Sequence, residues 1–153
     1  MKDTVRITTD MDPVPAIDIF ASAGGITLGF KEAGISTVCA VEIEKHRVAT
    51  FARHTPTATL LNDDVQRIDF SKYAGKVELI YGGPPCQPFS SGGQQRAASD
   101  ERNMIPAFIR AIATVQPAAF FMENVPGLVT GDRRAYFLQI LAEYRALGFA
   151  VSW

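Results

Sequence analysis

The chain has 153 residues, of which 47% are hydrophobic and 20% are charged, and its formal net charge is −1. This length and apolar fraction suit one domain with a sizeable core, and the mixed charges argue against a disordered chain. The charge also argues against a free-standing nucleic-acid binder, which usually carries a basic surplus. A nucleic-acid substrate would therefore need a basic surface that lies elsewhere.

The two cysteines, Cys39 and Cys86, lie far apart and show neither a disulfide framework nor a metal-ligand spacing. No apolar run approaches the roughly 20 residues of a membrane span. The N-terminus lacks a secretory signal pattern. We therefore expect a cytoplasmic protein without a metal site, with residues 1–13 as a flexible leader before a domain over 14–153.

Short apolar runs alternate with helical patterns along the chain. The predicted strands cover 16–20, 36–41, 58–61, 77–81 and 118–122, and 149–153 is typical of the opening of a sixth. The predicted helices cover 26–33, 44–54, 105–115 and 135–147, and residues 90–103 form the only long loop candidate. This alternation predicts an α/β fold with a mostly parallel sheet and helices on both faces.

Unusual residue clusters follow the predicted strands. They occupy 20–25, 42–43, 62–65, 82–90 and 123–127. Parallel α/β folds bind ligands beyond the carboxyl ends of their strands. The convergence of all five clusters on such ends predicts a ligand site there.

The first clusters suit an adenosine-type ligand. Small residues in 18–25 let the backbone approach a ligand, and the absence of G-x-G-x-x-G disfavours a nicotinamide or flavin site. Glu42, at the end of the second strand, can accept hydrogen bonds from both ribose hydroxyls. Ile43 can press on an adenine ring and Asp64 can accept from its amino group. The alternative is that each carboxylate only caps a helix or lies in a loop.

Cys86 lies in a stretch suited to holding a nucleophile. Two glycines and two prolines, Gly82 to Pro85, precede it and restrict the loop. A helix N-terminus or a cationic neighbour would favour the reactive thiolate. The alternative is an inert buried thiol, which is our prediction for Cys39 in the middle of a strand.

Glu123 leaves a very apolar strand, 118–122. Desolvation there would keep its carboxyl partly protonated near neutral pH, so that it can donate to a ring nitrogen. The alternative is a glutamate that caps the next helix.

These clusters, in this order, resemble the DNA (cytosine-5)-methyltransferase family. The hallmarks D-x-F-x-G-x-G-G, an acidic end to strand two, a D-D step, P-C-Q and E-N-V correspond to Asp18 to Gly25, Glu42, Asp63-Asp64, Pro85-Cys86-Gln87 and Glu123-Asn124-Val125. Ser22 departs from the pattern, because the family usually has glycine there. The resemblance implies a Rossmann-like fold that depends on S-adenosyl-L-methionine.

The resemblance also implies residue roles. The implied cofactor contacts are Phe20, Ala21, Gly24 and Gly25 at the methionine part, Glu42 at the ribose, Ile43, Asp64 and Val65 at the adenine, and Pro85 and Ile105 completing that wall. Cys86 would be the nucleophile and Glu123 the proton donor. The implied DNA-facing residues are Gln87, Ser90, Arg102 and Asn124. The substrate would be duplex DNA with a flipped cytosine, and the cofactor product S-adenosyl-L-homocysteine.

The resemblance covers about residues 15–153 but only the first half of the family pattern. A Q-x-R-x-R segment, a target-recognition domain and a C-terminal asparagine-containing segment are missing. We therefore expect a partial catalytic domain, truncated near the sixth strand, that is inactive alone and needs a second chain or remaining half. A missing basic region would also account for the net charge of −1.

Two rival functions stay open. One is a tRNA cytosine methyltransferase with the same Cys and Glu, and the other is a non-catalytic subunit that binds S-adenosylmethionine. The recognised DNA site, and the choice between a restriction–modification enzyme and a solitary or phage enzyme, are not decided by these residues.

Overall fold

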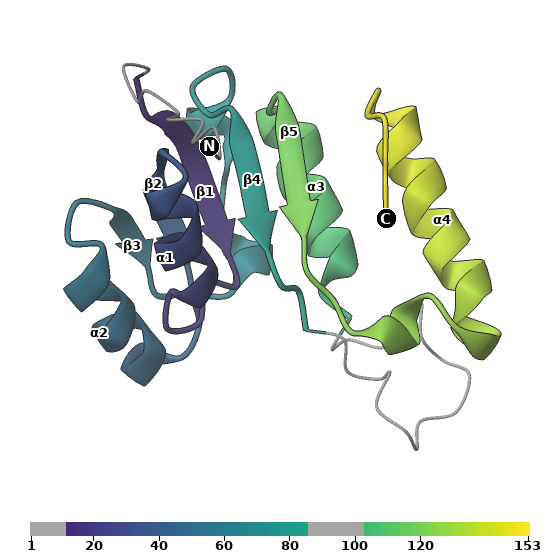
Figure 1. Cartoon of the computed structure of the whole chain (residues 1–153), viewed down its shortest axis with the longest axis horizontal. Helices are drawn as coiled ribbons and strands as arrows, with labels where there is room; N and C mark the ends of the chain where they lie inside the picture. Colours follow the sequence, from purple (N-terminus) through teal and green to yellow (C-terminus); the bar gives the residue numbers. More distant parts are fainter. Residues whose placement is uncertain (1–11, 86–102) are drawn as a thin grey trace, which may run out of the picture.

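The computed structural model describes residues 12–85 and 103–153, which form a parallel sheet flanked by helices (Figure 1). The strands are β1 (Val14–Ile19), β2 (Ile35–Val41), β3 (Thr59–Leu61), β4 (Leu79–Gly82) and β5 (Ala119–Met122). The α-helices are α1 (Gly25–Glu32), α2 (Lys45–His54), α3 (Ile105–Val115) and α4 (Arg134–Ala146). Short 3-10 turns are η1 (Val65–Arg67), η2 (Ser71–Tyr73), η4 (Pro126–Leu128) and η5 (Gly131–Arg133).

The strand order is β3-β2-β1-β4-β5, and every neighbouring pair is parallel. The chain proceeds outward from β1 through β2 to β3 and then crosses back to β4 on the other side of β1. This reversal places the carboxyl ends of β1 and β4 at the switch point where such sheets bind ligands. The predicted fold class, a Rossmann-like α/β sheet, is confirmed.

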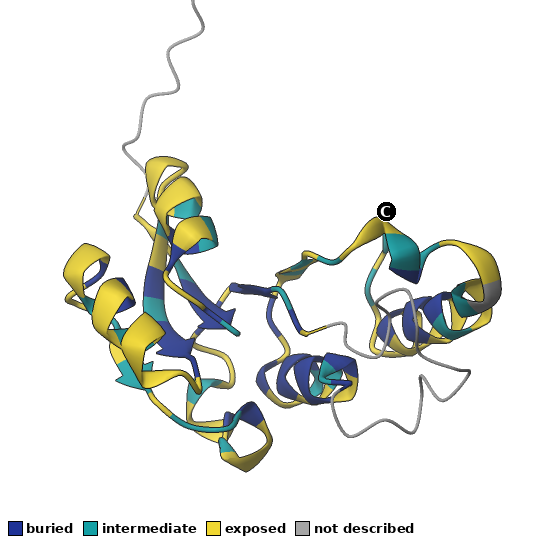
Figure 2. Ribbon diagram, turned by 90° about the horizontal axis from the view of Figure 1, so that it is seen from below, coloured by how far each residue is buried: buried dark blue, intermediate teal, exposed yellow. Residues whose placement is uncertain are grey.

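Helices cover both faces of the sheet, as the alternating pattern predicts (Figure 2). On one face, Ile17 and Ile19 of β1 pack in a cluster with Phe108 and Ile112 of α3. On the other face, Ala16 belongs to a smaller cluster that includes Phe30 of α1. Central strands are therefore buried on both sides, and all four residues of β4 are buried.

The predicted sixth strand does not form, which corrects the expectation for residues 149–153. The backbone N–H of Phe149 donates to the carbonyl of Tyr144, 3.2 Å away, and the chain after α4 adopts no strand. The Phe149 ring packs edge-on against Phe120, and Trp153 packs edge-on against Phe137. A cavity of about 610 Å³ is bordered by β5, α4 and residues 148–153, so this segment finds no strand beside it to pair with.

No helix in the described ranges is long and apolar enough to cross a membrane.

Gly82 lets the ends of β1 and β4 approach closely. A Cβ atom at this position would lie 1.8 Å from the carbonyl oxygen of Ile19. Because this oxygen belongs to a buried strand backbone, it cannot move aside as the tip of a flexible side chain would. The missing side chain at Gly82 therefore sets the distance between the two strand ends that carry the candidate site.

We expect Gly82→Ala to lower the free energy of unfolding by about 3 kcal/mol or more, because a backbone must shift to admit the methyl group. Urea unfolding of the purified chain measures this change. Gly29→Ala in α1 is the matched control, since a methyl group there would meet nothing within 4 Å and alanine favours helices by about 1 kcal/mol. Equal stability of both variants would contradict the close approach.

Candidate active site

The turn after β1 contains several residues with positive φ angles. Phe20, Ser22 and Gly24 have positive φ angles of 67°, 50° and 94°. A hydrogen bond from the N–H of Ala21 to the carbonyl of Val41, at 3.0 Å, joins this turn to the end of β2. Positive φ at non-glycine residues carries strain and is often found at ligand sites. The geometry brings the backbone of this turn to the end of β2.

Glu42, at the end of β2, is held by backbone groups from two elements. It is 7% exposed, and its carboxylate accepts from the N–H of Ser22 and from the N–H of Glu44, each at 2.8 Å. Arg47 of α2 approaches one carboxylate oxygen at 3.9 Å. A carboxylate has about four acceptor sites, so oxygen lone pairs remain for a ligand's hydroxyl groups. The Ser22 contact ties the strained turn to this acid.

A pocket of about 350 Å³ opens between these strand ends. This volume lies within the range of small-molecule sites. The lining residues are Phe20, Ser22, Val41, Glu42, Ile43, Arg47, Asp63, Val65, Gly83, Pro85 and Met104. Ile43 is 61% exposed, so it offers an apolar surface to a flat ring. The pocket thus combines an oriented acid, a strained backbone turn and apolar walls.

Glu123 and Asn124, directly after β5, meet the segment that leads from β4 to Cys86. A Cβ on Gly83 would lie 3.0 Å from the Glu123 carboxylate, so the acid rests against that glycine. The Asn124 side-chain amide donates to the carbonyl of Pro84 at 3.1 Å. Two side chains from the end of β5 therefore lie against the two residues that precede Pro85-Cys86.

The comparisons with known proteins agree with this geometry. The family model for C-5 cytosine-specific DNA methylases matches residues 14–153. The chain belongs to the C-5 cytosine-specific DNA methylase family. The pocket is lined by several of the residues to which the sequence resemblance assigns contacts with S-adenosylmethionine.

Two curated relatives are type II methyltransferases. M.PspPI of Psychrobacter sp. is 36% identical over 88% of this chain and 33% of its own length. M.NgoMIV of Neisseria gonorrhoeae is 35% identical over 90% of this chain and 44% of its own length. The methylase chain thus spans less than half the length of these relatives.

One solved structure is similar to this methylase in fold and in sequence. It is a protein encoded within an Escherichia coli prophage and assigned as a DNA modification methyltransferase. The TM-score is 0.72 at 30% identity, over 87% of this chain and 38% of that chain.

The structure brings together five of the predicted cofactor residues of the methylase. These are Phe20, Glu42, Ile43, Val65 and Pro85, all of which line the pocket. The other five are not among its lining residues. Asp64 caps η1 by accepting a hydrogen bond from the N–H of Gln66. Ala21 and Gly24 are buried in the turn after β1, and Gly25 begins α1. Ile105 is fully buried in the core.

Several pocket residues of the methylase were missed from the sequence. They are Ser22, Val41, Arg47, Asp63, Gly83 and Met104. Asp63, the neighbour of the predicted Asp64, is among the lining residues, and the pKa of Asp63 is lowered by the N–H of Asp64 and by the guanidinium of Arg67. The neighbouring Asn62 donates its side-chain amide to the carbonyls of Glu42 and Ile43, at 2.9 Å each. The polar run Asn62-Asp63-Asp64 was the sequence signal that could have identified Asp63.

One expectation about the end of β5 is corrected. Glu123 is exposed, because β5 lies at the sheet edge and its end opens to solvent, so the expected desolvation is absent from the described structure. The amide of Asn124 donates to the carbonyl of Pro84, and its side-chain oxygen accepts from the N–H of Val125. Its predicted position facing DNA stays a prediction.

Four predicted residues, Cys86, Gln87, Ser90 and Arg102, lie outside the described residues. Cys39 is buried in the core, as predicted, and burial raises the pKa of its thiol. Within 12–85 and 103–153, no group of three or more His, Cys, Asp or Glu side chains could hold a metal ion.

Asp18 forms a buried polar cluster beneath the strained turn. It is 1% exposed and accepts from the hydroxyl of Thr27 at 2.6 Å. The Tyr81 hydroxyl lies 2.8 Å from that of Thr27 and 2.6 Å from that of Thr37. The second carboxylate oxygen of Asp18 has no hydrogen-bond partner in the described structure. Burial, with a smaller contribution from Glu42, raises the pKa of Asp18 to about 7.

We expect Asp18 to make the methylase less stable as pH rises. Because its pKa is about 7 when folded and 3.8 for an ordinary aspartate, the fold favours the protonated acid. This stabilisation is complete below about pH 4 and is lost towards pH 7, at about 1.4 kcal/mol per pH unit. Asp18→Asn, which is always neutral, should therefore gain stability over the original chain across this window in urea unfolding.

Asp69→Asn is the matched control with the opposite sign. Hydrogen bonding from the N–H of Ser71 lowers the pKa of this exposed acid from its ordinary 3.8, so its removal should cost a constant amount of stability above about pH 4, and this cost should disappear at lower pH. If the difference between Asp18→Asn and the original chain does not change with pH, Asp18 ionises as an ordinary aspartate.

Proposed function

We propose that this chain is the cofactor-binding and nucleophile-bearing part of a DNA cytosine C5-methyltransferase. The main support is the position of Glu123 and Asn124, which contact the two residues directly before Pro85-Cys86. Pro85 also lines the pocket that contains Glu42. A proton donor, a nucleophile-bearing segment and an adenosine-type pocket thus share one end of the sheet. Their proximity in this family supports methyl transfer to a pyrimidine ring.

The pocket residues suit S-adenosyl-L-methionine. Glu42 is oriented by two backbone N–H groups before any ligand arrives, so it can receive the ribose hydroxyls without rearrangement. Ile43 and Val65 would flank the adenine, and the turn from Phe20 would border the methionine part. When bound, the cofactor supplies a methyl group activated by its sulfonium, and S-adenosyl-L-homocysteine remains.

Cys86 and Glu123 would make C5 of cytosine reactive. The Cys86 thiolate forms a bond to C6, Glu123 gives a proton to N3, and the π electrons of the C5–C6 bond move to C5. After C5 has gained the methyl group, its proton leaves to a base. The electrons left on C5 restore the double bond, and the C6–S pair returns to sulfur as N3 gives back its proton.

Because Glu123 is exposed, the substrate itself would have to shield its carboxyl from water in this scheme. A cytosine flipped out of duplex DNA would cover the carboxyl and remove water from it. Desolvation favours the protonated acid, which is the form that donates to N3. The base would thus help to create the proton donor that it requires.

The DNA-reading surface would come from the remaining part of the enzyme. The chain matches 33% and 44% of the lengths of M.PspPI and M.NgoMIV, which are type II methyltransferases. With a net charge of −1, these residues alone offer little attraction to DNA phosphates. We therefore expect no methyl incorporation into DNA by the 153-residue chain alone, and activity in a bacterial or phage-like cytoplasm when the enzyme is complete.

Covalent trapping tests the proposed nucleophile. The complete enzyme, with S-adenosyl-L-methionine, should form a stable adduct with duplex DNA that contains 5-fluorocytosine, because the fluorine blocks proton loss from C5. Cys86→Ser should abolish the adduct, and Glu123→Gln should slow its formation by about 10²–10⁴-fold. Denaturing electrophoresis measures both effects.

Cys39→Ser is the matched control, since that thiol is buried in the core and should leave trapping intact. The same assay on tRNA tests the rival substrate. Trapping on tRNA alone would assign an RNA methyltransferase, and trapping on neither would favour a non-catalytic subunit.

Cofactor binding tests the role of Glu42. In calorimetric titration of the 153-residue chain, Glu42→Gln should weaken S-adenosyl-L-methionine binding by about 10–100-fold, because hydrogen bonds to a charged group contribute about 1.5–3 kcal/mol. Glu44→Gln is the control, since the Glu44 side chain is 53% exposed and only its backbone N–H contacts Glu42. Equal affinity in both variants would place the ribose elsewhere.

A further inference from the structure

Three residues in neighbouring strands form a row directly beneath the candidate site. In the parallel pairing of β1, β4 and β5, Tyr81 lies opposite Asp18 on one side and opposite Phe121 on the other. Residues that lie opposite each other in paired strands share a face of the sheet. That face carries α1, because the Phe30 ring packs edge-on against both Tyr81 and Phe121, with centroid distances of 4.6 Å and 5.6 Å. We name Asp18, Tyr81 and Phe121 the support row.

Each member of the support row lies two positions before a residue of the candidate site. These site residues are, in the same order, Phe20, Gly83 and Glu123. Phe20 and Gly83 line the cofactor pocket, and the Glu123 carboxylate lies against Gly83. Two residues of a strand span only about 7 Å. A shift of one strand within the support row would therefore be passed on to the site.

The hydroxyl of Tyr81 belongs to a chain of hydrogen bonds with one direction. Thr27 of α1 donates its hydroxyl hydrogen to Asp18 at 2.6 Å, so Thr27 can only accept from Tyr81, at 2.8 Å. Tyr81 has then used its own hydrogen and accepts from Thr37 of β2, at 2.6 Å. The direction is fixed because a hydroxyl carries a single hydrogen. This chain joins β4 to β2, α1 and β1 through one side chain.

The chain of hydrogen bonds lies in the interior of the sheet. All four of its residues are buried, and Tyr81 has no exposed surface. Apolar side chains would fill this space at lower cost, because buried hydroxyl groups must be paired. A hydrogen-bond chain instead restricts its members to one arrangement. Burial also raises the pKa of Tyr81 to about 12, so its hydroxyl keeps the hydrogen that it donates.

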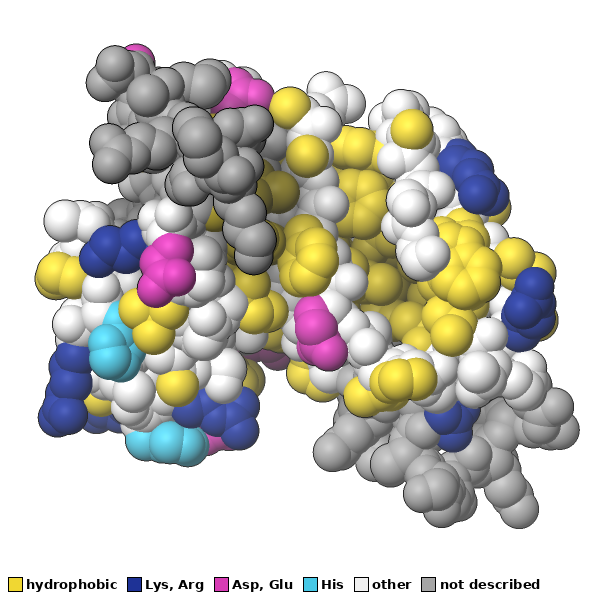
Figure 3. Space-filling model, in the orientation of Figure 1, with side chains coloured by type: hydrophobic (Ala, Val, Ile, Leu, Met, Phe, Trp, Pro, Cys, Tyr) yellow, Lys and Arg dark blue, Asp and Glu magenta, His cyan; other side chains and the backbone are white. Residues whose placement is uncertain are grey.

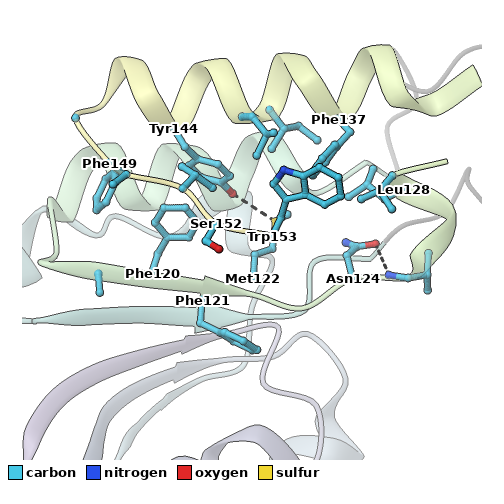
Figure 4. A pocket seen from close by; sticks show the side chains of 18 of the residues that line it. Phe120, Phe121, Met122, Asn124, Leu128, Phe137, Tyr144, Phe149, Ser152 and Trp153 are labelled. Carbon is cyan, nitrogen blue, oxygen red and sulfur yellow. Dashed lines mark hydrogen bonds between the residues drawn. The ribbon is translucent and has the colours of Figure 1, made fainter.

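The Phe121 side of the support row is held by ring packing. Phe121 is 46% exposed and lies on the opposite side of β5 from Phe120 and Tyr144 (Figure 4). Apolar side chains gather over β5 in the space-filling view (Figure 3). In the described structure β5 pairs with β4 alone. The contacts of Phe30 with Tyr81 and Phe121 therefore add to this pairing in placing the strand that carries Glu123.

We propose that Tyr81 is a positioning residue of the methyltransferase, whose hydroxyl fixes the end of β4, and thus the segment that leads to Cys86, relative to Glu123. The proposal rests on the proposed function for the reaction that this geometry serves. Tyr81 is fully buried and does not line the pocket, so it acts through Gly82 and Gly83, which follow it directly. Misplacement of reacting groups by about 1 Å can slow a reaction about 10²-fold.

Hydrogen exchange of the 153-residue chain tests the placement directly. Tyr81→Phe keeps the ring and removes only the hydroxyl. The amide of Glu123, which donates to β4 at the site end of the sheet, should then exchange about 10-fold faster. The amides of Ala119, at the other end of β5, and of Glu42, which donates to β3, should keep their rates. Equal acceleration of all three amides, or no change in any, would overturn the proposal.

Two further variants separate the hydrogen-bond chain from a general loss of stability. Tyr73→Phe is the matched control, because the Tyr73 hydroxyl pairs with the thiol of Cys39 and not with the support row. It should leave the Glu123 amide unchanged. Thr37→Val keeps the side-chain shape and removes the donor to Tyr81, so it should also speed exchange at Glu123. Combined with Tyr81→Phe, it should add less than its separate effect, since both break one chain. Full additivity would contradict that chain.

Kinetics of the complete enzyme test the consequence for the reaction. Tyr81→Phe should lower kcat, and the rate of trapping on 5-fluorocytosine DNA, by about 10–100-fold. The KM for S-adenosyl-L-methionine should stay the same, because the backbone groups that orient Glu42 lie outside the hydrogen-bond chain. An unchanged kcat, or a change confined to KM, would overturn the positioning role.

The two experiments also separate this proposal from the proposed function. If the original enzyme traps no DNA, the proposed function fails, and the exchange rate of the Glu123 amide still decides whether Tyr81 places the end of β4. If the original enzyme traps DNA and Tyr81→Phe changes neither exchange nor kcat, the positioning role fails and the proposed function stands.

Discussion

The contact between the backbones of β1 and β4 at Gly82 is the constraint on which the site depends. A methyl group there would overlap the Ile19 carbonyl oxygen, so the two strand ends lie as close as a bare backbone permits. One residue beyond each contact point, Phe20 and Gly83 line the same pocket. A wider spacing between the strands would separate the turn after β1 from the segment that leads to Cys86.

Two carboxyl groups shape the electrostatics of this region in different ways. Glu42 lies at the pocket, where two backbone N–H groups orient its carboxylate. Asp18, one strand away, is deeper and accepts only the Thr27 hydroxyl, so burial dominates and its pKa rises to about 7. The negative charge of Glu42 contributes to that rise, because like charges disfavour each other. A cationic ligand at the pocket would be attracted by the first acid and would ease ionisation of the second.

The fold and the gathering of the candidate residues at one end of the sheet could be predicted from the sequence, because both follow from local patterns. Apolar runs and helical spacing identify strands and helices, and parallel strands bring their ends together. Three features depend on neighbours that are distant in sequence: the place of Asp63 in the pocket lining, the hydrogen bond of Asn124 and the exposure of Glu123. Asn124 contacts Pro84 across 40 positions, and nothing in E-N-V indicates that partner. Residues 149–153 have the composition of a strand, but a strand also requires a neighbour to pair with.

β5 links the edge of the described sheet to the candidate site. Its carboxyl end leads into Glu123 and Asn124, which contact Gly83 and Pro84. An edge strand with half-covered phenylalanines opens more readily than a central one, because fewer apolar contacts and hydrogen bonds must break. Each opening would release the contacts that position the segment before Cys86. The packing that holds β5 in the sheet therefore also holds this segment next to Glu123.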